Sequence, residues 1–316
     1  MALYVNTNVT SLRTRTALTN DTNKLSTTYQ RLSTGLRINS AKDDAAGLQI
    51  SDRLTAQING LDQGNRNAND GIALAQVMEG ALDETTTMLQ RIRVLAIQAS
   101  NGTNTSIDRK SIQQEVRQLS EEISRIACKT TYAGQQVLAG AGKGMLGPKG
   151  QVRFQVGAYV NDILSVSLST GMTLSGIATL AIKRGTKDPD GKVISFSDSK
   201  ATTNPTGLIA SKKGYYFDVS TFDSAEASIQ AVDYLLNMVD SKRAELGAIE
   251  NRMESTIRNQ SNVSANVSDA RSRIRDTDYA EEASNLSAES IVQQAASSIL
   301  TQANQQPQIA LSLLQG

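Results

Sequence analysis

Apolar residues between positions 61 and 99 recur at steps that alternate between three and four. The repeating positions are Leu61, Gly64, Ala68, Gly71, Ala75, Met78, Leu82, Thr85, Leu89, Ile92, Ala96 and Ala99. This is the heptad period, which keeps one stripe of a helix turned toward a partner helix. Asn101 and Gly102 interrupt the stripe, and a second stripe follows at Ile112, Val116, Leu119, Ile123 and Ile126. The pattern predicts two helices joined by a turn.

The C-terminal half carries a third stripe of the same period. Its members are Ala225, Ile229, Val232, Leu236, Val239, Leu246, Met253 and Ile257. Arg243 and Glu250 also fall on stripe positions, so we expect the neighbouring Leu235 and Ile249 to share the packing. Three helices with this period predict an elongated bundle.

Both ends of the chain carry narrower stripes. Leu18, Leu25 and Leu32 are spaced by seven near the N-terminus, and the C-terminal stripe consists of Ala288, Val292, Ala295, Ile299 and Ala303, with Leu300 beside it. Ordering one residue costs ~1–2 kcal/mol, which such narrow stripes do not offset by burial within one chain. We therefore expect both ends to be disordered in the free monomer and to fold on association with other copies.

Residues 140–220 have a different pattern. Apolar and polar residues alternate over 152–156 and nearly alternate over 163–168, which predicts a β-hairpin. The stretch 183–213 is rich in Gly, Lys, Asp and Thr, and Pro189, Asp190 and Gly191 form a turn signal within it. We interpret this stretch as a small, exposed β domain.

These patterns predict a mainly α fold, in which both chain ends form a long coiled-coil-like helical bundle with a small β-rich central insertion. We assign residues 1–41 and 276–316 to a terminal coiled-coil domain. Residues 42–176 and 222–275 then form an inner helical-bundle domain with the β-hairpin, and residues 177–221 form a small outer domain.

Charge and composition exclude several classes of function. The chain has 32 basic and 31 acidic residues, so it lacks the basic surplus typical of proteins that bind nucleic acid or an anionic membrane. It contains no His, which rules out Ser-His-Asp and Cys-His nucleophile systems and HExxH zinc sites. Asp43 and Asp44 are better interpreted as helix-start charges or partners of Arg37 and Lys42 than as a catalytic pair. We expect no enzyme activity, no cofactor and no metal.

Two further features concern the thiol and the route out of the cell. Cys128 follows Ile126 and Ala127, and we expect it to be a half-buried, unreactive thiol. No apolar run approaches the ~18 residues of a membrane helix, and the N-terminus lacks a basic head followed by an apolar stretch. We therefore expect no membrane segment, and we expect that the protein leaves the cell without a cleaved secretory signal.

Two motifs at opposite ends of the chain resemble the signatures of bacterial flagellins. Residues 30–47 read QRLSTGLRINSAKDDAAG and resemble the N-terminal signature. The C-terminal signature is matched by ARSRI at 270–274, DYA at 278–280, QAN at 302–304 and LSLL at 311–314. The resemblance covers about residues 1–170 and 225–316.

The resemblance implies a structural subunit that polymerises into the extracellular bacterial flagellar filament for motility. In that family the two chain ends pair in the filament core, where we place Leu18, Leu25, Leu32, Val292, Ala295, Ile299 and Leu300. It also implies export in an unfolded state through the flagellar type III apparatus, a chaperone that holds the C-terminal helix, and a filament cap. Contacts between identical subunits that do not close into a ring build such an open polymer.

A further segment resembles the one that the vertebrate Toll-like receptor 5 recognises. Residues 90–97 read QRIRVLAI, and Arg91, Leu95 and Glu115 match the main contact residues of the family. Val94 stands where a Glu is common. Arg91 and Leu95 lie four apart on a helix face, and an exposed Leu beside an Arg would suit a binding partner. The alternative is that both pack between neighbouring subunits.

Two other functions stay open at this point. A hook–filament junction protein shares the terminal helices of the family but forms a short ring, so electron microscopy of long filaments would discriminate. A secreted enzyme or adhesin displayed on a filament is the second. Adhesion would have to reside in about residues 177–221, and deleting them while scoring motility against attachment would test it.

Overall fold

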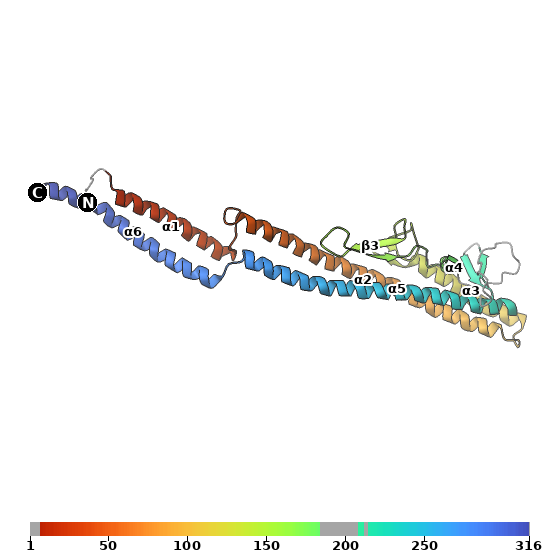
Figure 1. Ribbon diagram of the computed structural model, residues 1–316. Helices are drawn as coiled ribbons and strands as arrows, with labels where there is room; N and C mark the ends of the chain where they lie inside the picture. The colour runs from red at the N-terminus through yellow and green to blue at the C-terminus, as the bar shows by residue number, and fades with distance from the viewer. Residues whose placement is uncertain (1–6, 184–207, 212–213, 316) are drawn as a thin grey trace. The chain divides into compact units, whose positions relative to one another are not determined.

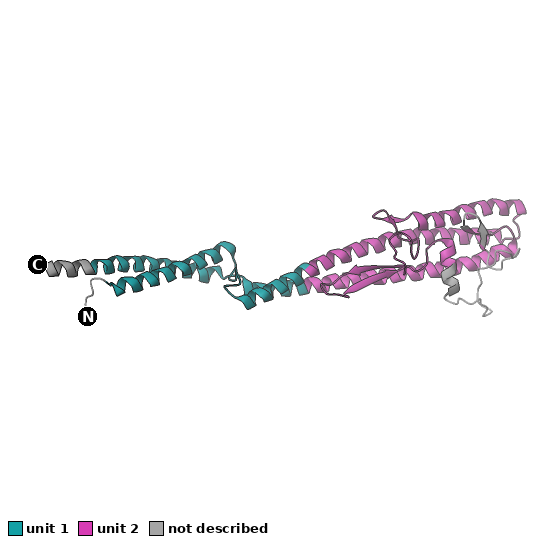
Figure 2. Cartoon of the chain, turned by 90° about the horizontal axis from the view of Figure 1, so that it is seen from above, with its two compact units in different colours: residues 1–59, 263–316 teal, residues 60–262 magenta. Residues whose placement is uncertain are grey.

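The computed structural model describes residues 7–183, 208–211 and 214–315 (Figure 1). It divides into two compact units (Figure 2). Unit 1 comprises Met1–Asn59 and Val263–Gly316, and unit 2 comprises Gly60–Asn262. The chain is mainly helical, as predicted. The helices are α1 (Val9–Thr34), α2 (Ala45–Ala99), α3 (Ser106–Lys129), α4 (Leu174–Lys183), α5 (Phe222–Arg275) and α6 (Tyr279–Gln315).

Unit 1 contains the two terminal helices, α1 and α6, which lie side by side (Figure 1). They are antiparallel, because Asn8 at the start of α1 donates a side-chain hydrogen bond to the Ala303 carbonyl at 2.6 Å, whereas Arg31 near its end faces Glu282. The polar Thr residues of α1 are accommodated by hydrogen bonds from their hydroxyls to the carbonyl four residues earlier. Both ends of the chain are thus helical and paired in this structure.

Unit 2 contains a continuous apolar core among α2, α3 and α5. Its buried members run from Ala68 to Met253 along the chain. Leu235 and Ile249 are buried, which confirms the expectation that they share the packing of the α5 stripe. Arg243 instead forms ion pairs with Glu79 and Asp83 of α2, at 3.6 and 3.0 Å. The interruption of the α5 stripe therefore brings a charge contact between α2 and α5.

The helix α3 packs on the core with the predicted stripe, and the residues Ser120 and Ala127 beside that stripe are buried as well. It buries Val116, Ser120, Ile123 and Ala127, while Ile112 and Leu119 are only partly buried. Cys128 is exposed, so the expectation of a half-buried thiol was wrong. The physical reason is angular, because Cys128 lies about 100° around the helix from the buried Ala127.

The predicted hairpin is confirmed as β3 (Gln151–Gln155) and β4 (Ile163–Ser167), paired antiparallel with Val152 opposite Val166. It lies on α2 at a row of small residues. A Cβ added at Gly60 would come within 2.8 Å of the Ala158 side chain, and one added at Gly64 would overlap the Val156 carbonyl. Gly64 therefore faces the hairpin backbone as well as Gln260 of the partner helix α5, and the heptad pattern predicted only the helix.

Further short strands flank this core. They are β1 (Thr131–Tyr132), β2 (Gln135–Gln136), β5 (Leu208–Ser211) and β6 (Gly214–Phe217). Leu208 and Phe217 are buried, and the Gln113 side chain of α3 holds the end of β6 by donating to the Phe217 carbonyl at 2.8 Å and accepting from the Val219 N–H at 2.6 Å. The turn predicted at 189–191 lies outside the described residues. The domain boundaries assigned from the sequence stay a prediction.

Candidate functional site

The two signature motifs meet in unit 1, where the chain passes from α1 to α2 and, near its other end, from α5 to α6. The helix α1 ends at Thr34 and α5 ends at Arg275. Between these ends the backbone N–H of Arg37 donates to the Arg275 carbonyl at 2.7 Å, and the N–H of Thr277 donates to the Gly35 carbonyl at 3.1 Å. Segments about 240 residues apart in sequence are therefore joined by main-chain hydrogen bonds.

Gly35 ends α1 in a way that a larger residue would disturb. It has a left-handed backbone with φ of 72°, and its N–H donates to the Arg31 carbonyl at 2.8 Å. This is the usual C-terminal cap of a helix, in which Gly avoids the strain that a Cβ would bring. A Cβ here would also come within 2.9 Å of the Tyr279 hydroxyl. The Gly of the first motif and the Tyr of the second therefore fit each other.

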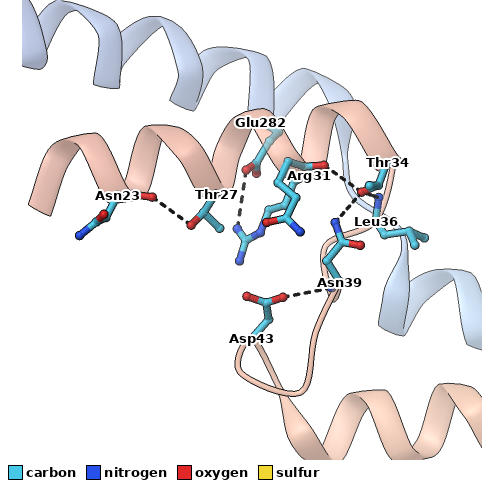
Figure 3. Close-up of polar contacts among 9 residues, drawn as sticks. Asn23, Thr27, Arg31, Thr34, Leu36, Asn39, Asp43 and Glu282 are labelled. Atoms are coloured by element: carbon cyan, nitrogen blue, oxygen red, sulfur yellow. Dashed lines mark hydrogen bonds and ion pairs between the residues drawn. The ribbon is translucent and has the colours of Figure 1, made fainter.

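The connecting loop is ordered by its own carboxylates. Asp43 accepts a hydrogen bond from the Ser40 N–H at 2.9 Å. It also accepts from the Asn39 N–H at 3.1 Å, and the Asn39 side chain donates to the Thr34 hydroxyl at 2.8 Å (Figure 3). The backbone hydrogen bond from Ser40, followed by that from Asn39, lowers the pKa of Asp43. Asp44 accepts from the Gly47 N–H at 2.9 Å and caps α2. The Asp pair therefore bonds to the backbone around the start of α2.

A buried charge lies between the terminal helices at this end. The Glu282 side chain of α6 is 7% exposed and lies 3.7 Å from the Arg31 guanidinium of α1, which is 32% exposed (Figure 3). One oxygen of Glu282 and the Nε of Arg31 have no hydrogen-bond partner among the described residues. A buried charge without its opposite charge is costly, so this pair favours one alignment of α1 on α6.

The residues predicted for the filament core fall into two groups. Leu25 is buried, and Leu18, Leu32 and Leu300 are half-buried. Val292 and Ile299 are 48% and 52% exposed, and Ala295 is also exposed. The α6 residues that bury themselves here are Glu282, Ala296 and Ala303. The predicted α6 stripe therefore lies mostly beside the α1 contact and leaves apolar groups uncovered.

Sequence reasoning missed Ile291, which is 66% exposed beside Val292. Its signal was a second β-branched apolar residue directly before a stripe position. With Val292, Ala295 and Ile299 it forms what we call the outer α6 stripe, defined by these four residues. Such a stripe of apolar side chains on a helix pair is a surface suited to further helices.

The second candidate site lies on α2 and α3 in unit 2. Arg91 donates to Glu115 from both Nε and Nη2, at 2.9 and 2.7 Å, and both side chains are about half exposed. Leu95, however, is only 2% exposed and belongs to the core, so its expected exposure was wrong. The helix α2 contacts both α3 and α5 and so buries a face wider than a single stripe. The exposed apolar residues nearby are Val94 and Ile97, which sequence reasoning did not assign.

Other kinds of site find no support in the part of the chain that the structure describes. No described group of three His, Cys, Asp or Glu side chains is placed to hold a metal ion. Within the same residues, no helix combines the length and the hydropathy that a membrane span requires.

Comparison with known proteins decides the family. The model of the bacterial flagellin N-terminal helical region matches residues 5–143, and that of the C-terminal helical region matches residues 229–314. The chain belongs to the bacterial flagellins. Flagellin is the structural subunit of the flagellar filament, an extracellular polymer, and has no enzymatic role. The resemblance inferred from the terminal motifs is thereby confirmed.

Individual relatives support the same assignment over the full chain. This flagellin is 37% identical to flagellin D of Vibrio anguillarum, over 99% of this chain and 100% of the relative. It is 38% identical to flagellin B of Vibrio cholerae over the same shares. A solved structure described as a flagellar hook-associated protein of Vibrio parahaemolyticus has a TM-score of 0.53 with 15% identity, covering 74% of this chain and 100% of that one. That likeness shows the fold alone, whereas the family models and the full-length relatives are those of flagellins.

Proposed function

We propose that the α1–α6 pair is the part of this flagellin that forms the filament core, with the outer α6 stripe packing on helices of neighbouring subunits. The observation that carries this proposal is the exposure of Val292 and Ile299 on a helix already paired with α1. Burial of apolar surface contributes about 25 cal/mol per Å², so a stripe repeated in every subunit stabilises a long polymer. Leu18, Leu25, Leu32 and Leu300 hold the pair itself.

A double substitution tests this role. Val292→Ser with Ile299→Ser removes the exposed apolar groups without touching the buried Ala296 and Ala303. We expect a folded chain that no longer forms filaments under electron microscopy. The matched control is Gln294→Ser with Thr301→Ser, which has the same spacing of seven on exposed polar positions of α6. Normal filaments from the first variant would overturn the proposal.

The same surface supports a transport partner before assembly. We propose that this flagellin leaves the cell unfolded through the flagellar type III apparatus, with an export chaperone covering α6 and a filament cap receiving the chain. The supporting feature is again the outer α6 stripe, which needs a cover in the cytoplasm. Co-purification of the flagellar export chaperone with the wild type, and its loss with Val292→Ser and Ile299→Ser, is the expected result.

We also propose recognition by Toll-like receptor 5 through the face formed by Arg91 and Glu115, with Leu95 supporting α2 from beneath. The ion pair is exposed and lies beside the uncovered Val94. Arg91→Ala should reduce signalling in receptor-reporter cells. The control is Arg125→Ala, which removes a comparably exposed ion pair with Glu122 on α3. Equal signalling by both variants would contradict this recognition site.

The positions at which the helices break also bear on the domain boundaries. We propose that residues 1–41 and 276–316 form the terminal domain, 42–176 and 222–275 the inner domain, and 177–221 the outer one. The breaks at Gly35 and Asp276, joined by main-chain hydrogen bonds, support a boundary there. Limited proteolysis of the monomer should cut first near these breaks.

A further inference from the structure

The chain contains two Asn-Gly dipeptides in very different surroundings. Asn101-Gly102 lies in the turn between α2 and α3, where both residues are exposed. Asn59-Gly60 lies in the interior of α2. An Asn side chain can be attacked by the backbone nitrogen of the following residue, and a following Gly places no side chain in the way. The same dipeptide therefore allows a comparison of two conformations within one molecule.

At Asn101 the turn holds the reacting groups together. The Thr103 N–H donates to the Asn101 side-chain oxygen at 3.3 Å, the arrangement of an Asx turn, which sets the side-chain amide over the Gly102 peptide. The same hydrogen bond polarises the amide carbonyl and is aimed at the oxygen that becomes negative during attack. Among the described residues, no hydrogen bond from the Gly102 N–H is found, and a Cβ at Gly102 would meet nothing within 4 Å.

At Asn59 the helix prevents the same reaction. The N–H of Gly60 belongs to the α2 hydrogen-bond ladder, and a helical backbone holds that nitrogen away from the preceding side chain. Gly60 also lies against Ala158 of the hairpin connection. The reaction there requires local opening of α2.

We propose that Asn101 is a site of spontaneous deamidation in this flagellin. The Gly102 nitrogen forms a bond to the Asn101 side-chain carbon and loses its proton, and ammonia leaves, which gives a cyclic imide. One water molecule then opens the ring to yield Asp or isoaspartate at position 101. Neither an oxidant nor a reductant is involved.

The product alters the contacts that hold the α2–α3 turn. The Asn101 carbonyl accepts hydrogen bonds from Arg109 at 3.2 Å and from the Asn104 N–H at 3.2 Å. In isoaspartate the main chain runs through the former side-chain carbonyl, which adds a methylene, and the original Asn101 carbonyl becomes a free carboxylate. Either product also places a negative charge after the C-terminal end of α2, where the helix dipole disfavours it. The turn is thus expected to loosen as the protein ages.

The experiment incubates the full chain in mildly alkaline buffer, with and without urea, and follows tryptic peptides 94–109 and 54–66 by mass spectrometry. In buffer we expect Asn101 to convert more than about tenfold faster than Asn59, because α2 must open first. In urea the two rates should become similar. Equal rates in buffer, or a rate ratio that is the same in urea, would overturn the proposal.

Two variants sharpen the test. Gly102→Ala should slow conversion at Asn101 several-fold while leaving the unfolding temperature unchanged, since the added methyl group meets open space. Thr103→Pro removes the N–H that holds the Asn101 side chain, and it should also slow conversion. If both variants convert as fast as the wild type, the turn does not promote the reaction and the proposal fails.

Discussion

Glycine is required at some positions of this flagellin and replaceable at others. Gly64 and Gly80 both lie in α2. A Cβ at Gly64 would overlap the Val156 carbonyl, where the Gln260 side chain also donates a hydrogen bond, whereas a Cβ at Gly80 meets nothing within 4 Å. The first Gly is required by the approach of the hairpin, and the second is not.

Substitution with Ala should therefore have opposite effects at these two positions. Gly64→Ala is expected to lower the free energy of unfolding by about 1–3 kcal/mol through overpacking. Gly80→Ala should raise it by about 0.5–1 kcal/mol, because Ala favours the helix. Urea unfolding followed by circular dichroism measures both, and stabilisation by Gly64→Ala would show that the hairpin does not approach α2 as described.

Glu250 is the residue at which pH dependence is expected. Burial raises its pKa, and the nearby Glu79 and Glu254 raise it further. Arg243 of the same helix is paired with Glu79 and Asp83. One Glu250 oxygen is buried with no hydrogen-bond partner among the described residues.

The raised pKa of Glu250 decides how the stability of the fold depends on pH. Protonated Glu250 favours the folded chain, so its contribution to stability is complete below its ordinary pKa and is lost as pH rises through the raised value. Glu250→Gln should therefore be more stable than the wild type at neutral pH, with the difference vanishing in acid. Urea titrations across pH measure this, with the exposed Glu226→Gln as the control. A difference that grows toward acid would contradict the assignment.

At the scale of elements, the pairing of α1 with α6 rests on few apolar contacts and one buried charge pair. The buried apolar residues of the pair are Leu25, Ala296 and Ala303, and the two alanines have small side chains. Apolar residues slide along one another at little cost, whereas a buried Glu282 away from Arg31 would be unpaired. We therefore expect the ion pair to fix which turn of α1 lies against which turn of α6.

Charge reversal tests this alignment. Arg31→Glu or Glu282→Arg alone should destabilise the helix pair by about 1–3 kcal/mol and stop filament growth, since Arg31 is partly exposed. The double reversal should restore growth in part. Arg13→Glu on an exposed position of α1 serves as the control. Thermal unfolding and sedimentation of polymer measure the effect, and additivity of the two single changes would argue against coupling.

At the scale of the whole molecule, the apolar core lies within one unit. All members of the continuous core fall between Ala68 and Met253, inside unit 2. We therefore expect deletion of residues 1–34, or of 279–316, to leave a helical monomer that cannot polymerise. Circular dichroism and electron microscopy test this, and normal filaments from either deletion would show that the ends are not required.

The two chain ends are expected to be less ordered in the free monomer than in the polymer. The structure shows both ends as paired helices, and their disorder in dilute monomer stays a prediction. Hydrogen exchange should find weak amide protection in α1 and α6 and strong protection in α2 and α5. Strong protection of α1 and α6 in the monomer would mean that the pair is stable without neighbouring subunits.

The sequence by itself determined the long helices, the hairpin and the family. A heptad pattern that continues over several turns predicts both the helix and its buried face, and the alternation at 152–156 predicts a strand. The terminal motifs identified the flagellins because their residues are needed at fixed positions. Gly35 and Asp43, for example, end one helix and order the loop before the next.

Only the tertiary structure decided which side chains are covered. Leu95 is buried because α2 packs against two partners, and Gly64 faces a hairpin in addition to α5. The outer α6 stripe is uncovered because α1 contacts the adjacent face with Ala296 and Ala303. Periodicity gives the direction of a side chain around its own helix, but the number and position of neighbours arise from contacts between segments far apart in sequence.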